Sequence, residues 1–159
     1  MDNGQSKKQT AKRKGEPKPK PNQVEVLVID DEPGVRSVLT EALASAGYLV
    51  YLADGTNVVE ALNARQYSLI ITDLKMSVMD GLQTLALAKE KSPEAKLIMI
   101  TGYPSEESLQ LCRELGVARY LVKPFSISEI RQVVRNVLRG KSSTGQRGMV
   151  DLTAERVGV

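Results

Sequence analysis

The sequence predicts an α/β protein with a five-stranded parallel sheet that is covered by helices on both faces. Two observations predict this fold class. Five short apolar runs alternate along the chain with segments whose apolar residues recur every three or four positions. The apolar runs are continuous, which is typical of parallel strands buried on both faces. Right-handed crossovers between such strands place the connecting helices on the two faces of the sheet.

The first half of the pattern is the clearest. Residues 24–29 are almost entirely apolar and predict a buried strand. From Gly34 the apolar residues take helical spacing, and Gly47 ends that helix. Residues 48–52 form the second expected strand, and residues 58–62 a short helix. These segments make the first strand–helix units of the fold.

The second half repeats the alternation. Each strand is a run rich in leucine, isoleucine or valine, and each helix that follows has an apolar stripe at helical spacing. The expected strands are residues 69–71, 97–100 and 119–122, and the expected helices are residues 82–91, 105–115 and 127–138.

Charge and composition divide the chain into three parts. Residues 1–22 hold seven basic and two acidic residues, together with several prolines, and predict a disordered basic leader. Residues 23–140 form the domain, and residues 141–159 are expected to be a flexible tail. The leader could attract nucleic acid by its charge, but no aromatic residue interleaves its lysines, so we favour a role in solubility.

Several functional classes are excluded by composition. The chain has no histidine, which removes imidazole metal ligands and every histidine-based catalytic triad. Cys112 is the only cysteine, so no internal disulfide forms. We find no signal peptide and no apolar run long enough to span a membrane, and we expect a cytoplasmic location.

Polar side chains stand where the expected strands end. Asp30 and Asp31 follow the first strand, Asp73 the third, Thr101 the fourth and Lys123 the fifth. Because sites in such sheets lie beyond the carboxyl ends of the strands, we expect these residues to converge. Three carboxylates in one place repel one another, and a hard divalent cation such as Mg²⁺ relieves that repulsion. We therefore predict a Mg²⁺ site.

A metal beside an amine and a hydroxyl indicates phosphoryl chemistry. The cation and Lys123 would neutralise phosphoryl oxygens, and Thr101 would donate a hydrogen bond to one of them. An aspartate carboxylate can itself be the nucleophile and become an acyl phosphate.

Four segments resemble the receiver domains of two-component response regulators. They are "VLVIDDEPGVR", "LIITDLKMSVMDGL", "LIMITGY" and "YLVKPF", in this order, and the resemblance extends over about residues 24–139. It implies a doubly wound, flavodoxin-like or CheY-like fold with strand order 2-1-3-4-5. It also implies that Asp73 is the phosphoacceptor, that Thr101 is the switch hydroxyl and that Lys123 is the phosphate partner.

The resemblance implies further roles around this centre. Asp31 would bind Mg²⁺ directly and Asp30 mainly through water, while Lys75 would offer its backbone carbonyl. Tyr120 would be the switch aromatic, and the bond from Lys123 to Pro124 would be cis.

The implied function is signalling and not enzymatic turnover. A histidine kinase or phosphotransfer protein would phosphorylate the chain, and a downstream protein would bind the face built by residues 105–115, 119–122 and 127–138. Residues 141–159 are too few for an output domain, so we expect a stand-alone receiver.

Two alternative functions remain open. The chain could be a phosphorylation-independent adaptor that works through its basic leader. A Mg²⁺-dependent phosphatase is a more remote alternative, because such enzymes have a second acid two residues after the nucleophile, where Lys75 stands.

The resemblance also implies a path for the water that hydrolyses the acyl phosphate. It is flanked by the residues two positions after Asp73 and two after Thr101, which here are Lys75 and Tyr103. Neither side chain is a carboxylate or an amide that would position water well. We therefore predict slow self-dephosphorylation.

Overall fold

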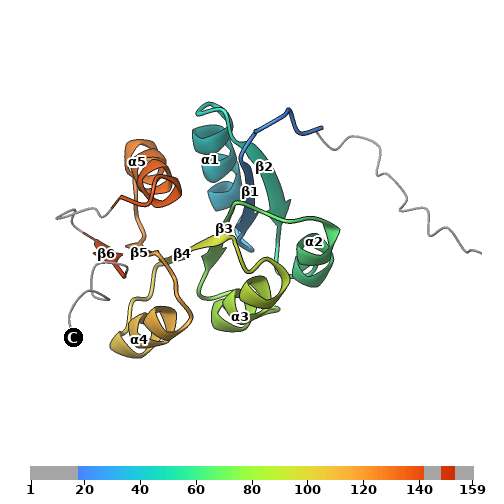
Figure 1. Ribbon diagram of the computed structural model, residues 1–159. Coiled ribbons are helices and arrows are strands. Elements are labelled where there is room, and N and C mark those ends of the chain that lie inside the picture. Colours follow the sequence, from blue (N-terminus) through green and yellow to red (C-terminus); the bar gives the residue numbers. More distant parts are fainter. Residues whose placement is uncertain (1–17, 142–147, 153–159) are drawn as a thin grey trace, which may run out of the picture.

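The computed structural model describes residues 18–141 and 148–152, and it alternates strands and helices along the chain (Figure 1). The strands are β1 Glu25–Ile29, β2 Leu49–Ala53, β3 Leu69–Asp73, β4 Lys96–Thr101, β5 Arg119–Val122 and β6 Met149–Asp151. The helices are α1 Pro33–Ala44, α2 Val58–Ala64, α3 Gly81–Lys91, α4 Glu106–Glu114 and α5 Ile127–Leu138. Every strand and helix predicted from the sequence is present, with ends that differ by at most a few residues.

The strands form one sheet in the order β2-β1-β3-β4-β5-β6. The first five are parallel, and their order is the one that the resemblance implies. The expectation of five strands is wrong by one, because Met149–Asp151 pairs antiparallel with β5. This strand lies in the segment expected to be a flexible tail. Three residues are too short to give a periodic signal, and their partner is distant in sequence.

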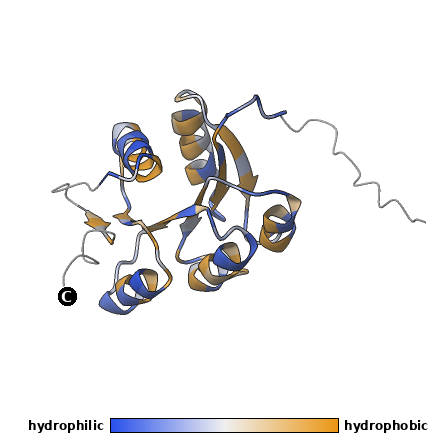
Figure 2. Ribbon diagram, in the orientation of Figure 1, coloured by the Kyte–Doolittle hydropathy of each residue, from blue (hydrophilic) through white to orange (hydrophobic). Residues whose placement is uncertain are grey.

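Helices cover both faces of the sheet (Figure 1). One apolar cluster joins the sheet to α1 and α5, through residues such as Leu39 and Ile130. A second cluster joins the other face to α2, α3 and α4, through Leu62, Leu85 and Cys112. Figure 2 shows the apolar residues along the strands and on the inward faces of the helices. Burial of this aliphatic surface is the main stabilising contribution to the fold.

Local sequence sets where the helices begin. Pro33 occupies the first turn of α1, where its missing N–H costs no hydrogen bond. Asp80 caps α3 by accepting a hydrogen bond from the backbone N–H of Leu82 at 2.7 Å. Ser126 and Glu129 form a capping box at the start of α5. Each of these starts follows the carboxyl end of a strand, where the polar residues gather.

Two expectations are tested only in part. Of the predicted leader, residues 1–17 lie outside the described part of the chain, as do residues 142–147 and 153–159 of the predicted tail. Within the described ranges, no helix has the length and apolar character needed to cross a membrane.

Candidate phosphoacceptor site

The fold brings the predicted polar residues to one end of the sheet. Asp30 follows β1 and is fully buried, and Asp73 is the last residue of β3 and is buried as well. Thr101 ends β4, and Lys123 follows β5. Since β1, β3, β4 and β5 are parallel neighbours, their carboxyl ends meet at the same edge.

Three carboxylates gather closely enough to bind one cation. Asp30, Asp31 and Asp73 each place a carboxylate oxygen within 4.8 Å of the others. Two ligands on opposite sides of a Mg²⁺ ion are about 4.2 Å apart, given a metal–oxygen distance of about 2.1 Å. The donors are hard oxygens, Asp30 and Asp73 are buried and Asp31 is half-buried. The chemistry of these donors fits Mg²⁺, and the 4.8 Å limit on their separation is close to the largest distance between two ligands of this ion.

Lys123 supplies a positive charge inside the acidic cluster. Its Nζ lies 3.2 Å from Asp30 Oδ2, 3.2 Å from Asp73 Oδ2 and 3.3 Å from Glu32 Oε1. Burial alone would lower the pKa of Lys123, but the charges of Asp30 and Asp73 together outweigh that effect and raise it. The ammonium group therefore stays charged and offsets part of the carboxylate repulsion.

For the pKa of Asp30, burial outweighs the neighbouring charge and hydrogen bonds. Burial raises the pKa of Asp30, and the hydrogen bond from the Glu32 backbone and the charge of Lys123 only partly counter it. Arg36 donates to the backbone carbonyl of Asp30 at 2.6 Å and fixes the turn into α1. A cation that binds this carboxylate would favour its ionised form.

The loops around the site position the other two acids. The backbone N–H of Ser77 donates to Asp31 Oδ2 at 3.0 Å, which links the loop after β3 to the loop after β1. The backbone N–H of Lys75 lies 3.4 Å from Asp73 Oδ1. The first contact holds Asp31 against the loop after β3, and the second is local to that loop.

Gly81 allows α3 to begin directly against the end of β3, which carries Asp73. A Cβ at this position would overlap the carbonyl oxygen of Asp73 and come within 2.6 Å of Leu74 Cα. The Gly81 N–H donates to the carbonyl of Leu74 at 2.9 Å. Only glycine fits this close approach of two backbones.

Thr101 and Tyr120 are both buried, but they make separate contacts. The hydroxyl oxygen of Thr101, at the strand end, accepts a hydrogen bond from the Tyr103 N–H at 2.9 Å. Tyr120 is not part of the acidic cluster: its ring is buried and its hydroxyl lies 2.7 Å from Ser108 Oγ in α4. The peptide bond from Lys123 to Pro124 is cis, as the resemblance implies.

Some contacts were not expected from the sequence. Glu32 is a third carboxylate partner of Lys123, Arg36 holds the Asp30 backbone, and Ser108 binds the Tyr120 hydroxyl. Glu32 and Arg36 belong to the quoted segment "VLVIDDEPGVR", so their position close to the acids was available as a signal. Nothing near Ser108 in the sequence points to Tyr120.

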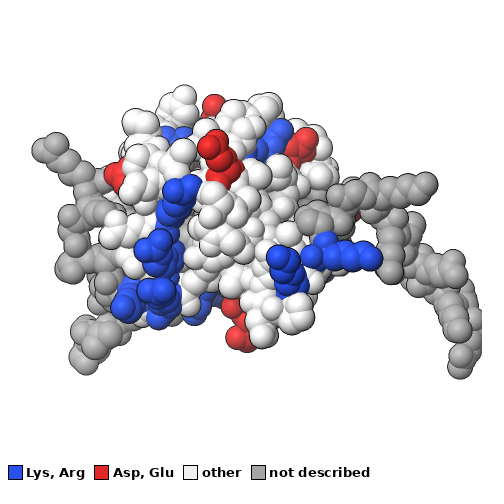
Figure 3. All heavy atoms as spheres, turned by 90° about the horizontal axis from the view of Figure 1, so that it is seen from above, with Lys and Arg blue, Asp and Glu red and all other residues white. Residues whose placement is uncertain are grey.

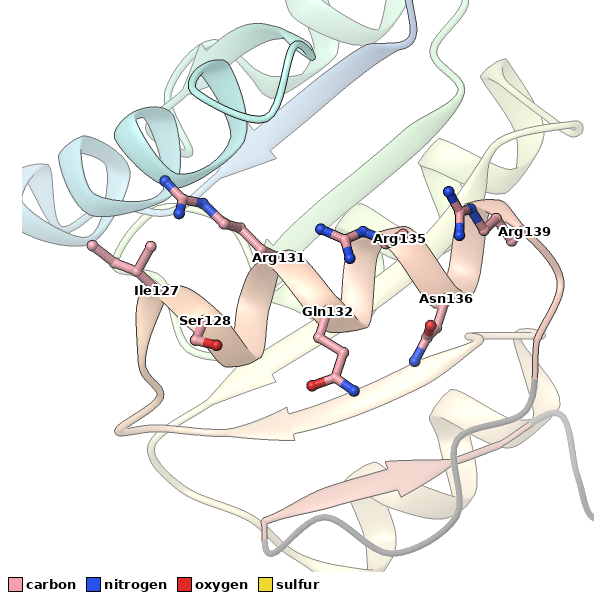
Figure 4. A pocket seen from close by; sticks show the side chains of 7 residues that line it. All are labelled: Ile127, Ser128, Arg131, Gln132, Arg135, Asn136 and Arg139. Atoms are coloured by element: carbon pink, nitrogen blue, oxygen red, sulfur yellow. The ribbon is translucent and has the colours of Figure 1, made fainter.

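A hollow on the surface of α5 lies away from the acidic cluster. It measures about 690 Å³ and runs along α5, where Arg131, Arg135 and Arg139 lie on one side and Gln132 and Asn136 on the other (Figure 4). Figure 3 shows a row of basic side chains over this helix. Its lining contains no carboxylate or nucleophilic thiol, so the acidic cluster remains the candidate site.

Curated proteins with similar sequences include a phosphotransferase and several transcriptional regulators. Sporulation initiation phosphotransferase F of Bacillus subtilis (strain 168) is 31% identical over 119 residues, which are 74% of this chain and 96% of that protein. The chain spans only 24% to 26% of longer transcriptional regulators that it also matches.

Solved structures share the fold. A CheY-like receiver domain protein from Methanospirillum hungatei JF-1 superposes with a TM-score of 0.71 at 24% identity, over 74% of this chain and 95% of that one. A response regulator from Burkholderia pseudomallei, solved with a phosphorylated aspartic acid, calcium ion and citrate, gives 0.66 at 26% identity, over 73% and 66%.

The family assignment rests on the match to a family model. The model described as the response regulator receiver domain matches residues 26–135, which include the strand ends that carry the acidic cluster, Thr101 and Lys123. The chain therefore belongs to the response regulator receiver domain family.

Proposed function

We propose that this chain is a phosphorylation-controlled signalling module whose phosphoacceptor is Asp73. The observation that carries the proposal is the contact of Lys123 Nζ with both Asp30 and Asp73, at 3.2 Å each, beside a third carboxylate. A buried aspartate next to a cation-binding pair and an amine has what a phosphoryl acceptor needs. The phosphorylated aspartic acid in the Burkholderia pseudomallei relative supports this assignment.

The proposed step is a direct phosphoryl transfer. A carboxylate oxygen of Asp73 attacks phosphorus, the bond to the donor's histidine nitrogen breaks, and an acyl phosphate forms. Lys123 then pairs with a phosphoryl oxygen, and the Thr101 hydroxyl turns from the Tyr103 N–H to donate to another. Mg²⁺, held by Asp30, Asp31, Asp73 and the Lys75 carbonyl, would supply charge neutralisation at the transferring group.

The donor is a histidine kinase or a phosphotransfer protein. A hollow of about 270 Å³ lies beside the site and is lined by Val35, Val38, Pro124 and Phe125 together with Lys123 and Gly34. Val38 is 41% exposed, although it is an apolar residue. This apolar surface next to Lys123 is suited to bind a protein donor, which must bring its phosphorylated histidine to Asp73.

The output is a change in partner binding at the face formed by α4, β5 and α5. Phosphorylation adds about 1.5 to 2 negative charges at Asp73. The movement of Thr101 toward the phosphoryl group would change the packing of Tyr120, which lies on the adjacent strand. The proposal includes the cytoplasmic location and the absence of enzymatic turnover expected from the sequence.

Intact mass spectrometry with Mg²⁺ and acetyl phosphate tests the proposal. The native chain should gain one phosphoryl group, the Asp73→Asn variant should gain none, and the Asp54→Asn variant, altered outside the cluster, should behave like the native chain. Titration calorimetry with Mg²⁺ on the same samples reports the metal site. The absence of both phosphoryl gain and Mg²⁺ binding would favour the phosphorylation-independent adaptor.

A further inference from the structure

The outer edge of β5 is covered by a segment from far along the chain. The Val122 N–H donates to the carbonyl of Gly148 at 2.9 Å, and the Leu152 N–H donates to the carbonyl of Ala118 at 3.2 Å. Between these two bonds β6 runs antiparallel to β5, with Tyr120 opposite Val150. Residues 148–152 therefore satisfy the backbone of β5 along its whole length.

The side chains of this segment alternate between the two apolar clusters. Leu152 is 4% exposed and belongs to the cluster that contains Tyr120 and Cys112 of α4. Val150, two residues earlier, packs against the same cluster, whereas Met149 packs against the cluster on the α5 side. The alternation is that of a strand held between two helical layers.

Few interactions hold residues 148–152 on β5. The strand has three residues, pairs on one side only, and has a single fully buried apolar neighbour in Leu152. The chain just after α5 is held by a separate contact, because the buried guanidinium of Arg119 donates to the carbonyl of Lys141 at 2.7 Å. The segment can leave β5 without loosening the end of α5, and such elements open at low free energy.

We propose that the edge of β5 is a strand-binding surface for an extended segment of a partner protein, and that residues 148–152 are its displaceable occupant in the free chain. The fitting segment runs antiparallel to β5 and has apolar residues two positions apart. The inference rests on the proposed function only in assigning the displacing segment to a downstream partner.

The surface is close to the proposed phosphorylation site along the backbone. Val122, which donates to Gly148, is paired in the sheet with Thr101 and is followed by Lys123. The strand that would receive the partner is therefore followed by Lys123 and lies beside Thr101, the two residues proposed to contact the phosphoryl group.

A structural role is the competing explanation. A short antiparallel strand also protects an edge from unwanted pairing. The two explanations differ in the native chain, where a displaceable segment gives way to an equivalent strand added in excess and a permanent sixth strand does not.

The test uses the full chain and a synthetic peptide of sequence GMVDL, blocked at both ends, observed by amide NMR. In the variant Val150→Asp with Leu152→Asp the chain's own segment no longer fits. The peptide should shift the amide signals of Arg119–Val122 in this variant, with an affinity at least tenfold above that for the native chain. In the native chain the tethered segment competes at an effective concentration on the order of millimolar.

Two controls and one replacement variant accompany the test. A peptide with aspartate in place of its valine and leucine should shift nothing, and the surface variant Val59→Asp should behave like the native chain. If the double variant does not fold, Leu152→Ala gives the same comparison. The inference is overturned if the peptide leaves β5 unshifted in the variant, if excess peptide never displaces the segment in the native chain, or if the peptide binds both chains equally well. Acetyl phosphate labelling of the same samples tests the role of Asp73 independently.

Discussion

The side-chain nitrogen of Lys75 lies 4.4 Å from the centre of the Tyr103 ring, so that a contact joins the loop after β3 to the loop after β4. This is the geometry of a cation–π pair. The two residues are the ones that flank the path of hydrolytic water in the implied receiver site. Neither side chain is a carboxylate or an amide that would orient a water molecule toward Asp73.

Replacing Lys75 with asparagine should therefore accelerate loss of the phosphoryl group. The amide would hydrogen-bond a water molecule, and the ring of Tyr103 would lose its partner. The half-life of phosphorylated protein, followed by intact mass after removal of the donor, should be long in the native chain and several-fold shorter in the variant. Lys89→Asn, on the exposed side of α3, is the control. A native half-life of seconds would contradict the prediction.

Removal of the Lys123 charge should destabilise the fold in a way that Mg²⁺ corrects. In Lys123→Met the carboxylates of Asp30 and Asp73 lose the ammonium that lies 3.2 Å from each. We expect the free energy of unfolding to fall by about 3 kcal/mol, the cost of leaving buried charge unpaired. Since Mg²⁺ neutralises the same carboxylates, saturating Mg²⁺ should stabilise the variant more than the native chain.

Urea denaturation with and without Mg²⁺ measures both effects. Lys89→Met removes an exposed lysine and should change neither stability nor its dependence on Mg²⁺. Equal stabilisation of Lys123→Met and the native chain by Mg²⁺ would show that the lysine and the metal act on different groups.

The sequence predicted the parts of the fold that depend on periodicity. Runs such as residues 69–71 are apolar throughout because they are buried on both faces, and this places Asp73 at a strand end. The same rule located Thr101 and Lys123. It did not locate β6, since a three-residue strand is defined by its distant partner, β5. Contacts such as that between Lys75 and Tyr103 depend on loop conformations that periodicity does not encode.

Gly81→Ala should disturb the end of β3, where Asp73 lies. The added methyl would overlap the Asp73 carbonyl oxygen, so the start of α3 or the end of β3 has to move. We expect a loss of about 1–3 kcal/mol in the free energy of unfolding and slower phosphoryl uptake. Gly34→Ala, in the first turn of α1 with no heavy atom within 4 Å of its Cβ, is the matched control for stability and should leave the free energy of unfolding unchanged. Equal stability of the two variants in urea would contradict the steric argument.

Burial of Cys112 should make stability depend on alkaline pH. Burial raises the pKa of this thiol to about 12, from an ordinary 9.0. Because the unfolded thiol loses its proton first, the free energy of unfolding should be unaffected by this group below about pH 9. Between pH 9 and 12 it should fall by up to about 1.4 kcal/mol per unit. Cys112→Val should lack that contribution, so the difference between the two chains measures it. Parallel pH profiles would contradict the prediction.

The hydroxyl pair of Ser108 and Tyr120 should couple α4 to β5 energetically. Their oxygens lie 2.7 Å apart in a buried position, and Ser105 N–H approaches the tyrosine hydroxyl only at 3.4 Å. Ser108→Ala leaves that hydroxyl without its close partner and should cost about 1–2 kcal/mol. Tyr120→Phe removes the hydroxyl itself.

A double-mutant cycle isolates this pair. Adding Ser108→Ala to Tyr120→Phe should cost less than Ser108→Ala alone, with a coupling energy of about 1 kcal/mol measured by urea denaturation. Ser45→Ala, an exposed serine of another helix end, should not couple with Tyr120→Phe. Additive effects of the two buried changes would mean that the hydroxyls do not hold α4 against β5. The position of Tyr120 would then depend on the apolar packing of its ring.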